Sequence, residues 1–233
     1  MRLESILARV HSFAPTFVHK IYQISDNSIL KDKPFMDVYW QLAKDGRMNL
    51  HLREAYNLYH YLKVAIPLGG DIAEFGVFKG GTAKLICSFK GNVPLHLFDS
   101  FKGLPETDEH VDFYKKGDLG DTSLSNVRSY LKEYEKINYY EGWFPDVALQ
   151  ELADEIDFCF VHLDVDIYKS TLSGLEFFYP RLRNGGVLIS HDYNRISCPG
   201  VKKAFDEFMA NRDEELTPLW DTQCIFRKHM RDS

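Results

Sequence analysis

Three polar side chains alternate at the end of an apolar run in the segment FCFVHLDVDIYKST, residues 158–171. If this run is a β-strand that stays extended, His162, Asp164 and Asp166 point to the same side, because successive strand side chains alternate between faces. Unpaired carboxylates are costly to bury, so we expect a polar partner for them: a metal ion, a cofactor hydroxyl, an arginine or water. The segment therefore predicts an active or binding site.

A second apolar run, in GGVLISHDYN, residues 185–194, ends in His191 and Asp192. In open α/β sheets, ligands bind at the carboxyl ends of the strands. If the two strands are neighbours, Asp164, Asp166, His191 and Asp192 converge, and three of these four side chains could hold an octahedral divalent cation. The alternative interpretation is that His191 and Asp192 only cap the next turn.

The segment DIAEFGVFKGG, residues 71–81, predicts a strand that runs into a glycine-rich turn and then a helix. Glycines let the backbone approach a ligand closely, and a helix N-terminus offers free N–H donors. The G-x-G-x-x-G spacing of a dinucleotide site is missing. Glu74 before the first glycine favours a ligand that carries an ammonium group over one that carries a pyrophosphate. A turn that serves only helix packing is the alternative.

The next predicted strand, in LHLFDSFKGLP, residues 95–105, also ends in an acid, Asp99. In doubly wound folds an acid at this position commonly binds ribose hydroxyls, since a carboxylate can accept from two hydroxyls at once. Asp99 is therefore a candidate ribose ligand. Its alternative role is to cap a turn or a helix.

Strands and helices alternate from Asp71 onward, which predicts an α/β fold with a doubly wound, mostly parallel sheet. The predicted strands are 72–75, 95–98, 138–141, 158–163 and 187–190, and the predicted helices are 82–89, 124–134, 171–179 and 199–211. Apolar runs at 219–220 and 224–226 predict a terminal antiparallel hairpin. Residues 1–65, with a helix at 52–64, form an N-terminal helical cap of the same domain, and 66–233 form its main part.

The composition excludes several classes of function. The chain has 233 residues, a net charge of -6, and no excess of positive charge that would attract nucleic acid in general. It has no signal peptide and no apolar stretch of roughly 18 residues, so we expect a cytoplasmic protein without a membrane span. Its four cysteines lack a C-x-x-C pair and are expected to be buried thiols.

These motifs, in this order, resemble the class I S-adenosylmethionine-dependent methyltransferases, and most closely the macrocin O-methyltransferase (TylF-type) family. The resemblance covers about residues 50–210 and rests on DIAEFGVFKGGTAKL, LHLFDSFKGLP, YYEGWFPD, HLDVDIYKSTLSGLEFFYPRLRNGGVLISHDY and PGVKKAFDEF. It implies a Rossmann-like sheet and methyl transfer from S-adenosylmethionine to a hydroxyl, typically on a deoxysugar of a natural product. It also implies a divalent cation, usually magnesium.

The resemblance assigns parts of the cofactor to residues of this chain. It implies that the methionine part lies against Glu74, Gly76, Gly80 and Gly81, the ribose against Asp99, and the adenine against Gly142 and Trp143, with Ser100 and Asp164 also at the cofactor.

The acceptor side follows from the same resemblance. It implies that Asp164, His191 and Asp192 bind the cation, with Asp164 as a possible general base and His191 or His162 as alternative bases. The other interpretation of His162 is a core histidine whose hydrogen bonds are satisfied. The family pattern after the fifth strand is Asp-Asp-Tyr, whereas this chain has a histidine first. Imidazole is a poorer magnesium ligand than carboxylate and favours zinc, iron, nickel or manganese. The expected partner is a small acceptor, a sugar or another hydroxyl-bearing metabolite, and the apolar N-terminal helices could form a homodimer.

The long loop 103–122 is expected to be either a functional lid or a disordered segment. Phe113 and Tyr114 could close over the substrate or could serve only as loop anchors. Lys169 could orient the substrate. Two other classes stay open. His162, Asp164 and His191 formally match the two-histidine, one-carboxylate set of a non-haem iron oxygenase, although that site normally sits on an all-β fold. A binding protein that keeps the cofactor site but has lost transfer chemistry is the other.

Overall fold

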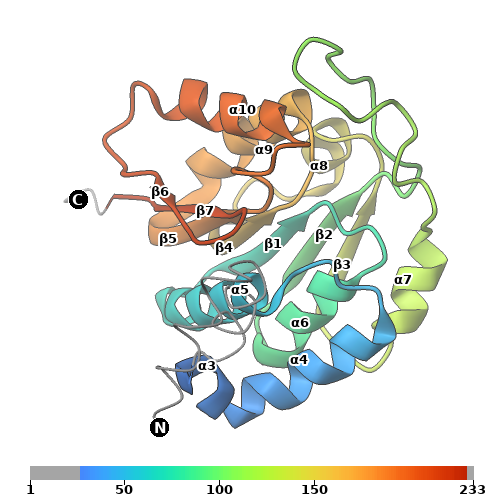
Figure 1. Cartoon of the computed structure of the whole chain (residues 1–233), viewed down its shortest axis with the longest axis vertical. Coiled ribbons are helices and arrows are strands. Elements are labelled where there is room, and N and C mark those ends of the chain that lie inside the picture. The colour runs from blue at the N-terminus through green and yellow to red at the C-terminus, as the bar shows by residue number, and fades with distance from the viewer. Residues whose placement is uncertain (1–26, 230–233) are drawn as a thin grey trace, which may run out of the picture.

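A seven-stranded sheet forms the centre of the computed structural model, which describes residues 27–229 (Figure 1). The strands are β1 (Asp71–Phe75), β2 (Leu95–Asp99), β3 (Ile137–Glu141), β4 (Phe158–Leu163), β5 (Leu182–Ser190), β6 (Thr217–Pro218) and β7 (Cys224–Arg227). Their order across the sheet is β3-β2-β1-β4-β5-β7-β6. Strands β1 to β5 pair in parallel, and β7 pairs antiparallel with β5 and β6. The predicted mostly parallel sheet with an antiparallel end is confirmed.

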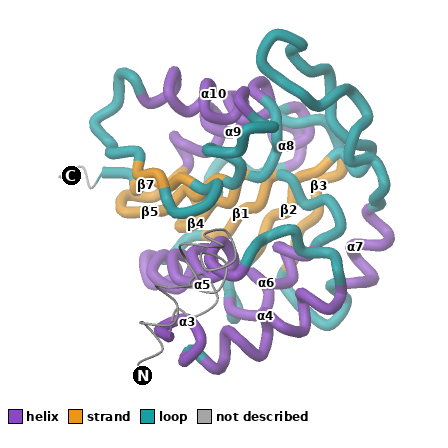
Figure 2. Tube along the Cα trace, in the orientation of Figure 1, coloured by secondary structure: helices purple, strands orange, loops and turns teal. Residues whose placement is uncertain are grey.

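Helices cover both faces of this sheet (Figure 2). One layer holds α3 (Asn27–Lys31), α4 (Lys33–Asp45), α5 (Leu52–Ala65), the short 3₁₀ helix η1 (Ile66–Leu68), α6 (Gly81–Phe89) and α7 (Leu124–Tyr130), and the other holds α8 (Asp146–Glu151), α9 (Tyr168–Arg181) and α10 (Pro199–Met209). Neighbouring residues of β1 serve opposite layers: Ile72 packs into the core under α4, α5 and α6, and Ala73 packs into the core under α8, α9 and α10.

The central strand β4 is buried along its whole length. A parallel strand between two helical layers has both faces in the core, so its sequence is a continuous apolar run rather than an alternating one. This is the run FCFVHL that leads to the acidic cluster. The burial explains why the polar side chains after Leu163 are delivered to the carboxyl edge of the sheet.

Several element boundaries differ from those expected. Helix α9 begins at Tyr168, three residues before the expected start at residue 171. Strand β5 begins at Leu182, which pairs with Phe158 before the register between β4 and β5 shifts. Strand β6 comprises Thr217–Pro218 instead of residues 219–220. The six-residue helix α8 is too short to give a clear helical period in the sequence.

The predicted N-terminal cap lies partly outside the described residues. From residue 27 onward it is largely helical, and α4 and α5 pack together with α6 in one helical layer against the sheet. The boundary between a cap at 1–65 and a main part at 66–233 stays a prediction. Within residues 27–229, no helix is both long enough and apolar enough to cross a bilayer. The four cysteines are buried and free, as expected.

Candidate functional site

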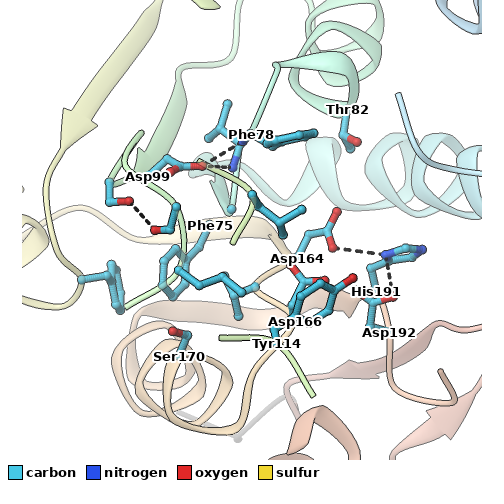
Figure 3. Close-up of a pocket in the computed structure, with 18 of the residues that line it drawn as sticks. Phe75, Phe78, Thr82, Asp99, Tyr114, Asp164, Asp166, Ser170, His191 and Asp192 are labelled. Atoms are coloured by element: carbon cyan, nitrogen blue, oxygen red, sulfur yellow. Dashed lines mark hydrogen bonds and ion pairs between the residues drawn. The ribbon is translucent and has the colours of Figure 1, made fainter. Parts of the chain in front are cut away.

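A pocket opens at the carboxyl edge of the sheet, where the ends of β1, β2, β4 and β5 meet (Figure 3). The structure brings most of the predicted site residues to its wall. These are Gly76, Gly81, Asp99, Ser100, Gly142, Trp143, Asp164, Asp166, His191 and Asp192. Asp99 lies toward one end of the pocket, and Asp164, His191 and Asp192 lie together at the other (Figure 3). Segments far apart in sequence, from the loop around Arg47 to the turn at Arg195, therefore form one cavity.

Two residues predicted to touch the cofactor do not line this pocket. Glu74 is completely buried, and its Oε1 lies 3.1 Å from Nδ1 of His162, its partner in the β1–β4 register. Gly80 sits before α6 with a φ of 79°, where an added Cβ would lie 3.2 Å from the Val127 side chain. Their contact with the cofactor stays a prediction.

His162 also faces away from the pocket, because it is fully buried against Glu74. The structure thus contradicts its expected role as an alternative base, since a base must reach the acceptor. Burial raises the pKa of Glu74 to about 7, although the hydrogen bond from His162 opposes that shift. Among the described residues, Glu74 Oε2 and His162 Nε2 have no hydrogen-bond partner. The pair is a buried polar contact behind the glycine-rich turn.

Gly76 is the residue that lets the ends of β1 and β4 meet. Its φ is 93°, and an added Cβ would lie 1.8 Å from the carbonyl oxygen of Asp164. The two strand ends are also held together by the Asp164 N–H, which donates to the Phe75 carbonyl at 2.9 Å. No larger side chain fits here. The glycine therefore positions the Asp164 carboxylate next to the glycine-rich turn.

Gly81 lets the segment before α5 approach the same turn. An added Cβ at Gly81 would lie 2.5 Å from the carbonyl oxygen of Arg47. Arg47 and Asn49 consequently line the pocket, with the Arg47 guanidinium 4.4 Å from the centre of the Tyr130 ring. Neither residue was predicted from the sequence. A loop residue whose contacts lie more than 30 positions away in the chain has no recognisable motif around it.

Asp99 caps the glycine-rich turn, which is the alternative role that the sequence left open for it. Its Oδ2 accepts hydrogen bonds from the backbone N–H groups of Val77 and Phe78, both at 2.8 Å, and its Oδ1 accepts from Phe101 N–H at 2.7 Å. A carboxylate has about four acceptor positions, so about one is left for a hydroxyl. Asp99 thus holds the glycine-rich turn in shape and still lines the pocket.

His191 is the centre of the acidic end. Its Nδ1 lies 3.1 Å from Oδ1 of Asp164 and 3.1 Å from Oδ1 of Asp192, and its Nε2 lies 3.5 Å from Oε1 of Glu54 (Figure 3). The Arg195 guanidinium donates to the same Oδ1 of Asp192 at 3.0 Å. Glu54 and Arg195 were absent from the predicted site, because Glu54 comes from α5 and Arg195 from an irregular turn.

Charge shapes the protonation of this end. Burial lowers the pKa of His191, but the carboxylates of Asp164, Asp192 and Glu54 outweigh it and hold that pKa well above its usual range. Burial raises the pKa of Asp192, but His191 and Arg195 outweigh it and lower the pKa to about 2. For Asp166, burial and the neighbouring Asp164 and Asp192 all raise the pKa well above its usual range. Asp166 therefore favours the neutral form.

The acidic end also fits a divalent cation. Asp164, His191 and Asp192 each offer one ligand atom, and these atoms lie within 4.8 Å of one another. Ligands at about 2.1 Å in an octahedral sphere are about 3 Å apart, close to the observed separations around His191 Nδ1. Asp192 Oδ2 is buried and has no hydrogen-bond partner among the described residues. A buried carboxylate oxygen needs a hydrogen-bond donor or a cation, so these three ligand residues are compatible with a bound cation.

Two aspartates at this end of the pocket have a strained backbone. Asp166 has a φ of 60° and Asp192 a φ of 66°, a left-handed conformation that residues other than glycine rarely adopt. Such strain persists only where the surrounding structure enforces it, and it gathers at functional sites. The sequence does not reveal this left-handed conformation, because aspartate is also common in ordinary backbone conformations and only tolerates this one.

The long loop contributes Tyr114 to the pocket, while Phe113 stays 68% exposed. Asp112 anchors the loop: its Oδ1 accepts from the first N–H of α9, Tyr168, at 2.9 Å, and its Oδ2 accepts from Asp108 N–H at 2.9 Å. Lys169, which the sequence suggested could orient the substrate, does not line the pocket.

Curated relatives carry the same core. The demethyldecarbamoylnovobiocin O-methyltransferase of Streptomyces niveus is 29% identical over 163 residues, which are 62% of this chain and 60% of that protein. The 8-demethyl-8-(2,3-dimethoxy-alpha-L-rhamnosyl)-tetracenomycin-C 4'-O-methyltransferase of Streptomyces olivaceus is 27% identical over 165 residues, 63% of this chain and 62% of that protein. The similarity thus spans somewhat less than two thirds of the length of either relative.

The fold is shared with solved structures. The O-methyltransferase NovP superposes with a TM-score of 0.67 at 24% sequence identity, and the match covers 79% of this chain and 83% of that one. This likeness confirms the expected Rossmann-like fold with its antiparallel end. The sequence model of one family, macrocin-O-methyltransferase (TylF), matches residues 31–228. Because this match takes in both ends of the pocket and nearly the whole described chain, the protein belongs to the macrocin-O-methyltransferase (TylF) family.

Proposed function

We propose that this chain is an S-adenosylmethionine-dependent O-methyltransferase that acts on a hydroxyl of a sugar or small natural product with help from a divalent cation. One observation carries the proposal. A single pocket joins the glycine-rich turn, Asp99 and Trp143 at one end to Asp164 and His191 at the other. A cofactor end and an acceptor end within one cavity are what a direct group transfer needs. The printed names of both curated relatives, O-methyltransferases of glycosylated natural products, support the acceptor class.

The proposed cofactor pose follows the lining residues. The methionine part lies against Gly76 and Gly81, where the backbone can approach closely. Its carboxylate is bound by Arg47 and Asn49, which line that part of the pocket. The ribose uses the remaining acceptor position of Asp99.

At the far end of the cofactor, the adenine lies beside Gly142 and the half-exposed Trp143. An aromatic ring can cover the apolar face of a base and keep its edge in water. Ser100 shapes this region through its own turn, because its hydroxyl donates to the Gly103 carbonyl at 2.8 Å. The residues of the first, second and third strand ends therefore orient one extended ligand.

In the transfer, the sulfonium of the cofactor supplies a reactive methyl group. The chain aligns an acceptor hydroxyl with that methyl and removes the hydroxyl proton. Asp164 is placed for the second task, since its side chain is 24% exposed at the pocket wall. Tyr114 closes the acceptor side from the long loop. Water exclusion there strengthens each polar contact to the acceptor.

Asp164, His191 and Asp192 would hold the divalent cation. When bound, such a cation neutralises the negative charge that develops on the acceptor oxygen. Asp166, which favours its neutral form, can then donate a hydrogen bond instead of adding negative charge. A homodimer and a cytoplasmic location stay predictions.

The test is transfer of a labelled methyl group from S-adenosylmethionine to a panel of glycosides, nucleotide sugars and phenols, followed by mass spectrometry. We expect product with at least one hydroxyl acceptor, loss of product after chelation, and recovery with added Mn²⁺ or Mg²⁺. Turnover that ignores chelator would contradict the cation. Lack of S-adenosylhomocysteine binding would contradict the whole proposal, and cofactor binding without turnover on any acceptor would favour a binding protein.

A further inference from the structure

Glu54 is a buried carboxylate that the chemistry described so far does not use. It lies in the first turn of α5 and is 1% exposed. Its Oε2 accepts from the His51 N–H at 2.9 Å, and its Oε1 accepts from the Thr222 hydroxyl at 2.6 Å. Two distant segments therefore hold this carboxylate in one orientation. It does not line the pocket, yet it approaches His191 from behind.

Donors surround the Glu54 carboxylate despite this burial. It accepts from the His51 N–H, from the Thr222 hydroxyl and from the Thr222 N–H. A fixed carboxylate 3.5 Å from Nε2 of His191 favours an N–H on that nitrogen. A cation that displaces the proton from the opposite nitrogen, Nδ1, then finds a lone pair on the pocket side of the ring.

That opposite nitrogen points into the acidic end of the pocket. His191 Nδ1 lies 3.1 Å from one oxygen each of Asp164 and Asp192. The second oxygen of Asp192 is buried and has no hydrogen-bond partner among residues 27–229. One ligand atom each of Asp164, His191 and Asp192 thus lie within 4.8 Å of one another, and Glu54 contacts the opposite nitrogen of the imidazole.

We propose that Glu54 is a positioning residue that holds the His191 proton on Nε2 and thereby makes Nδ1 a ligand for a divalent cation of the first transition series. The inference rests on the cation site of the proposed function and names the kind of cation it takes. A carboxylate behind a ligating histidine fixes the ring and raises its basicity. Imidazole binds Mn²⁺, Fe²⁺ or Zn²⁺ more readily than Mg²⁺, so this pair selects against magnesium.

Calorimetric titration of the full chain with Mn²⁺ and with Mg²⁺, each with and without S-adenosylhomocysteine, tests the inference. The variants are Glu54→Gln, His191→Asp and the double variant, with Thr222→Val as the matched control. Thr222→Val removes a hydrogen bond to Glu54 but keeps its carboxylate beside His191. Thermal unfolding of each variant shows that it is folded.

We expect the wild type to bind Mn²⁺ more tightly than Mg²⁺, and Glu54→Gln to weaken Mn²⁺ binding roughly ten- to a hundredfold. Thr222→Val keeps most of the affinity. In the His191→Asp background, where no ring N–H faces α5, the Glu54→Gln change no longer weakens binding. Equal Mn²⁺ affinity of wild type and Glu54→Gln would overturn the inference, as would an equal loss in both backgrounds.

A second measurement needs no change at Glu54. Ring ¹⁵N spectra of the wild type with Zn²⁺, with the His191 signals assigned from their loss in His191→Asp, report which nitrogen keeps its proton. Protonated Nε2 and ligated Nδ1 are expected, and the reverse would overturn the inference. A wild type that binds S-adenosylhomocysteine but no cation also overturns it while leaving the transferase intact. A wild type that binds cation but not S-adenosylhomocysteine counts against the proposed function instead.

Discussion

Asp99 combines two tasks at the scale of a single residue. Three backbone N–H groups, those of Val77, Phe78 and Phe101, already donate to its carboxylate. Its contribution to cofactor binding is therefore both direct, through one remaining acceptor position, and indirect, through the shape of the glycine-rich turn. An amide in place of the carboxylate would impair both, because it has a single acceptor oxygen.

For this reason we predict that Asp99→Asn weakens S-adenosylhomocysteine binding by about 1–3 kcal/mol, roughly five- to 150-fold, in calorimetric titration. Asp154→Asn, an exposed change away from the pocket, serves as the control and should bind like wild type. Unchanged affinity of Asp99→Asn would argue against any role of Asp99 at the cofactor.

The buried carboxyl of Glu74 leads to a prediction about how stability depends on pH. Its pKa of about 7 in the folded chain exceeds the ordinary value of 4.5, because burial disfavours the charged form. Between these values the folded state holds more protons than the unfolded state, so this contribution to stability is complete at low pH and is lost as pH rises toward 7. Each unit is worth about 1.4 kcal/mol, which sets an upper bound of about 3 kcal/mol.

The Glu74→Gln variant should consequently gain stability relative to wild type as pH rises from about 5 to about 8. Urea unfolding without cofactor at several pH values measures it, and the gain should approach but not exceed about 3 kcal/mol. The exposed carboxylate of Glu141 provides the control, since Glu141→Gln should show no such trend. Parallel pH profiles for Glu74→Gln and wild type would refute this assignment of the buried proton.

At the scale of elements, the sequence predicted strands β1, β2, β4 and the second half of β5 because each is an apolar run between turn residues. Strand β3, with the sequence INYYE, was predicted from the alternation of strands with helices. The sequence also predicted which strand ends carry polar groups, and parallel strands bring those ends to one edge. It could not predict that β1 and β4 pair Glu74 with His162, because register depends on tertiary packing. Nor could it find Glu54 or Arg47, whose partners lie far along the chain.

The close approach of β1 and β4 at their carboxyl ends depends on Gly76. We predict that Gly76→Ala lowers the free energy of unfolding by about 3 kcal/mol or more, since its Cβ would lie 1.8 Å from a backbone oxygen at an unfavourable φ of 93°. Gly117 is the matched control, because its φ is 87° and nothing lies within 4 Å of an added Cβ. Gly117→Ala should cost only about 1–2 kcal/mol of conformational strain. Equal losses in chemical denaturation would show that the close approach at Gly76 is unimportant.

The long loop depends on one anchor at its middle. Asp112→Ala leaves the N–H groups of Tyr168 and Asp108 without their acceptor, so we expect faster proteolytic cleavage within residues 103–122 and a stability loss of about 1–2 kcal/mol. Asp118→Ala removes only a bond to the Lys115 N–H inside the exposed part of the loop. If limited proteolysis cleaves both variants at the same rate, the loop is not held by Asp112.

At the scale of the whole molecule, the two helical layers have different tasks around one pocket. The layer with α5 supplies Glu54 behind His191, and the segment before α5 supplies Arg47 beside the glycine-rich turn. The opposite layer, with α9, anchors the loop that carries Tyr114. The sheet edge between them carries Asp99, the last residue of β2, and Asp164, directly after β4. The proposed reaction thus needs both layers, and the family match, residues 31–228, takes in both.

A crystal structure with S-adenosylhomocysteine and Mn²⁺, located by its anomalous signal, tests this account most directly. We predict one cofactor in the pocket, with its ribose at Asp99 and its sulfur directed toward Asp164. We also predict Mn²⁺ bound by Asp164, His191 Nδ1 and Asp192. A cofactor outside this pocket, or Mn²⁺ absent from these three residues at saturating concentration, would contradict it.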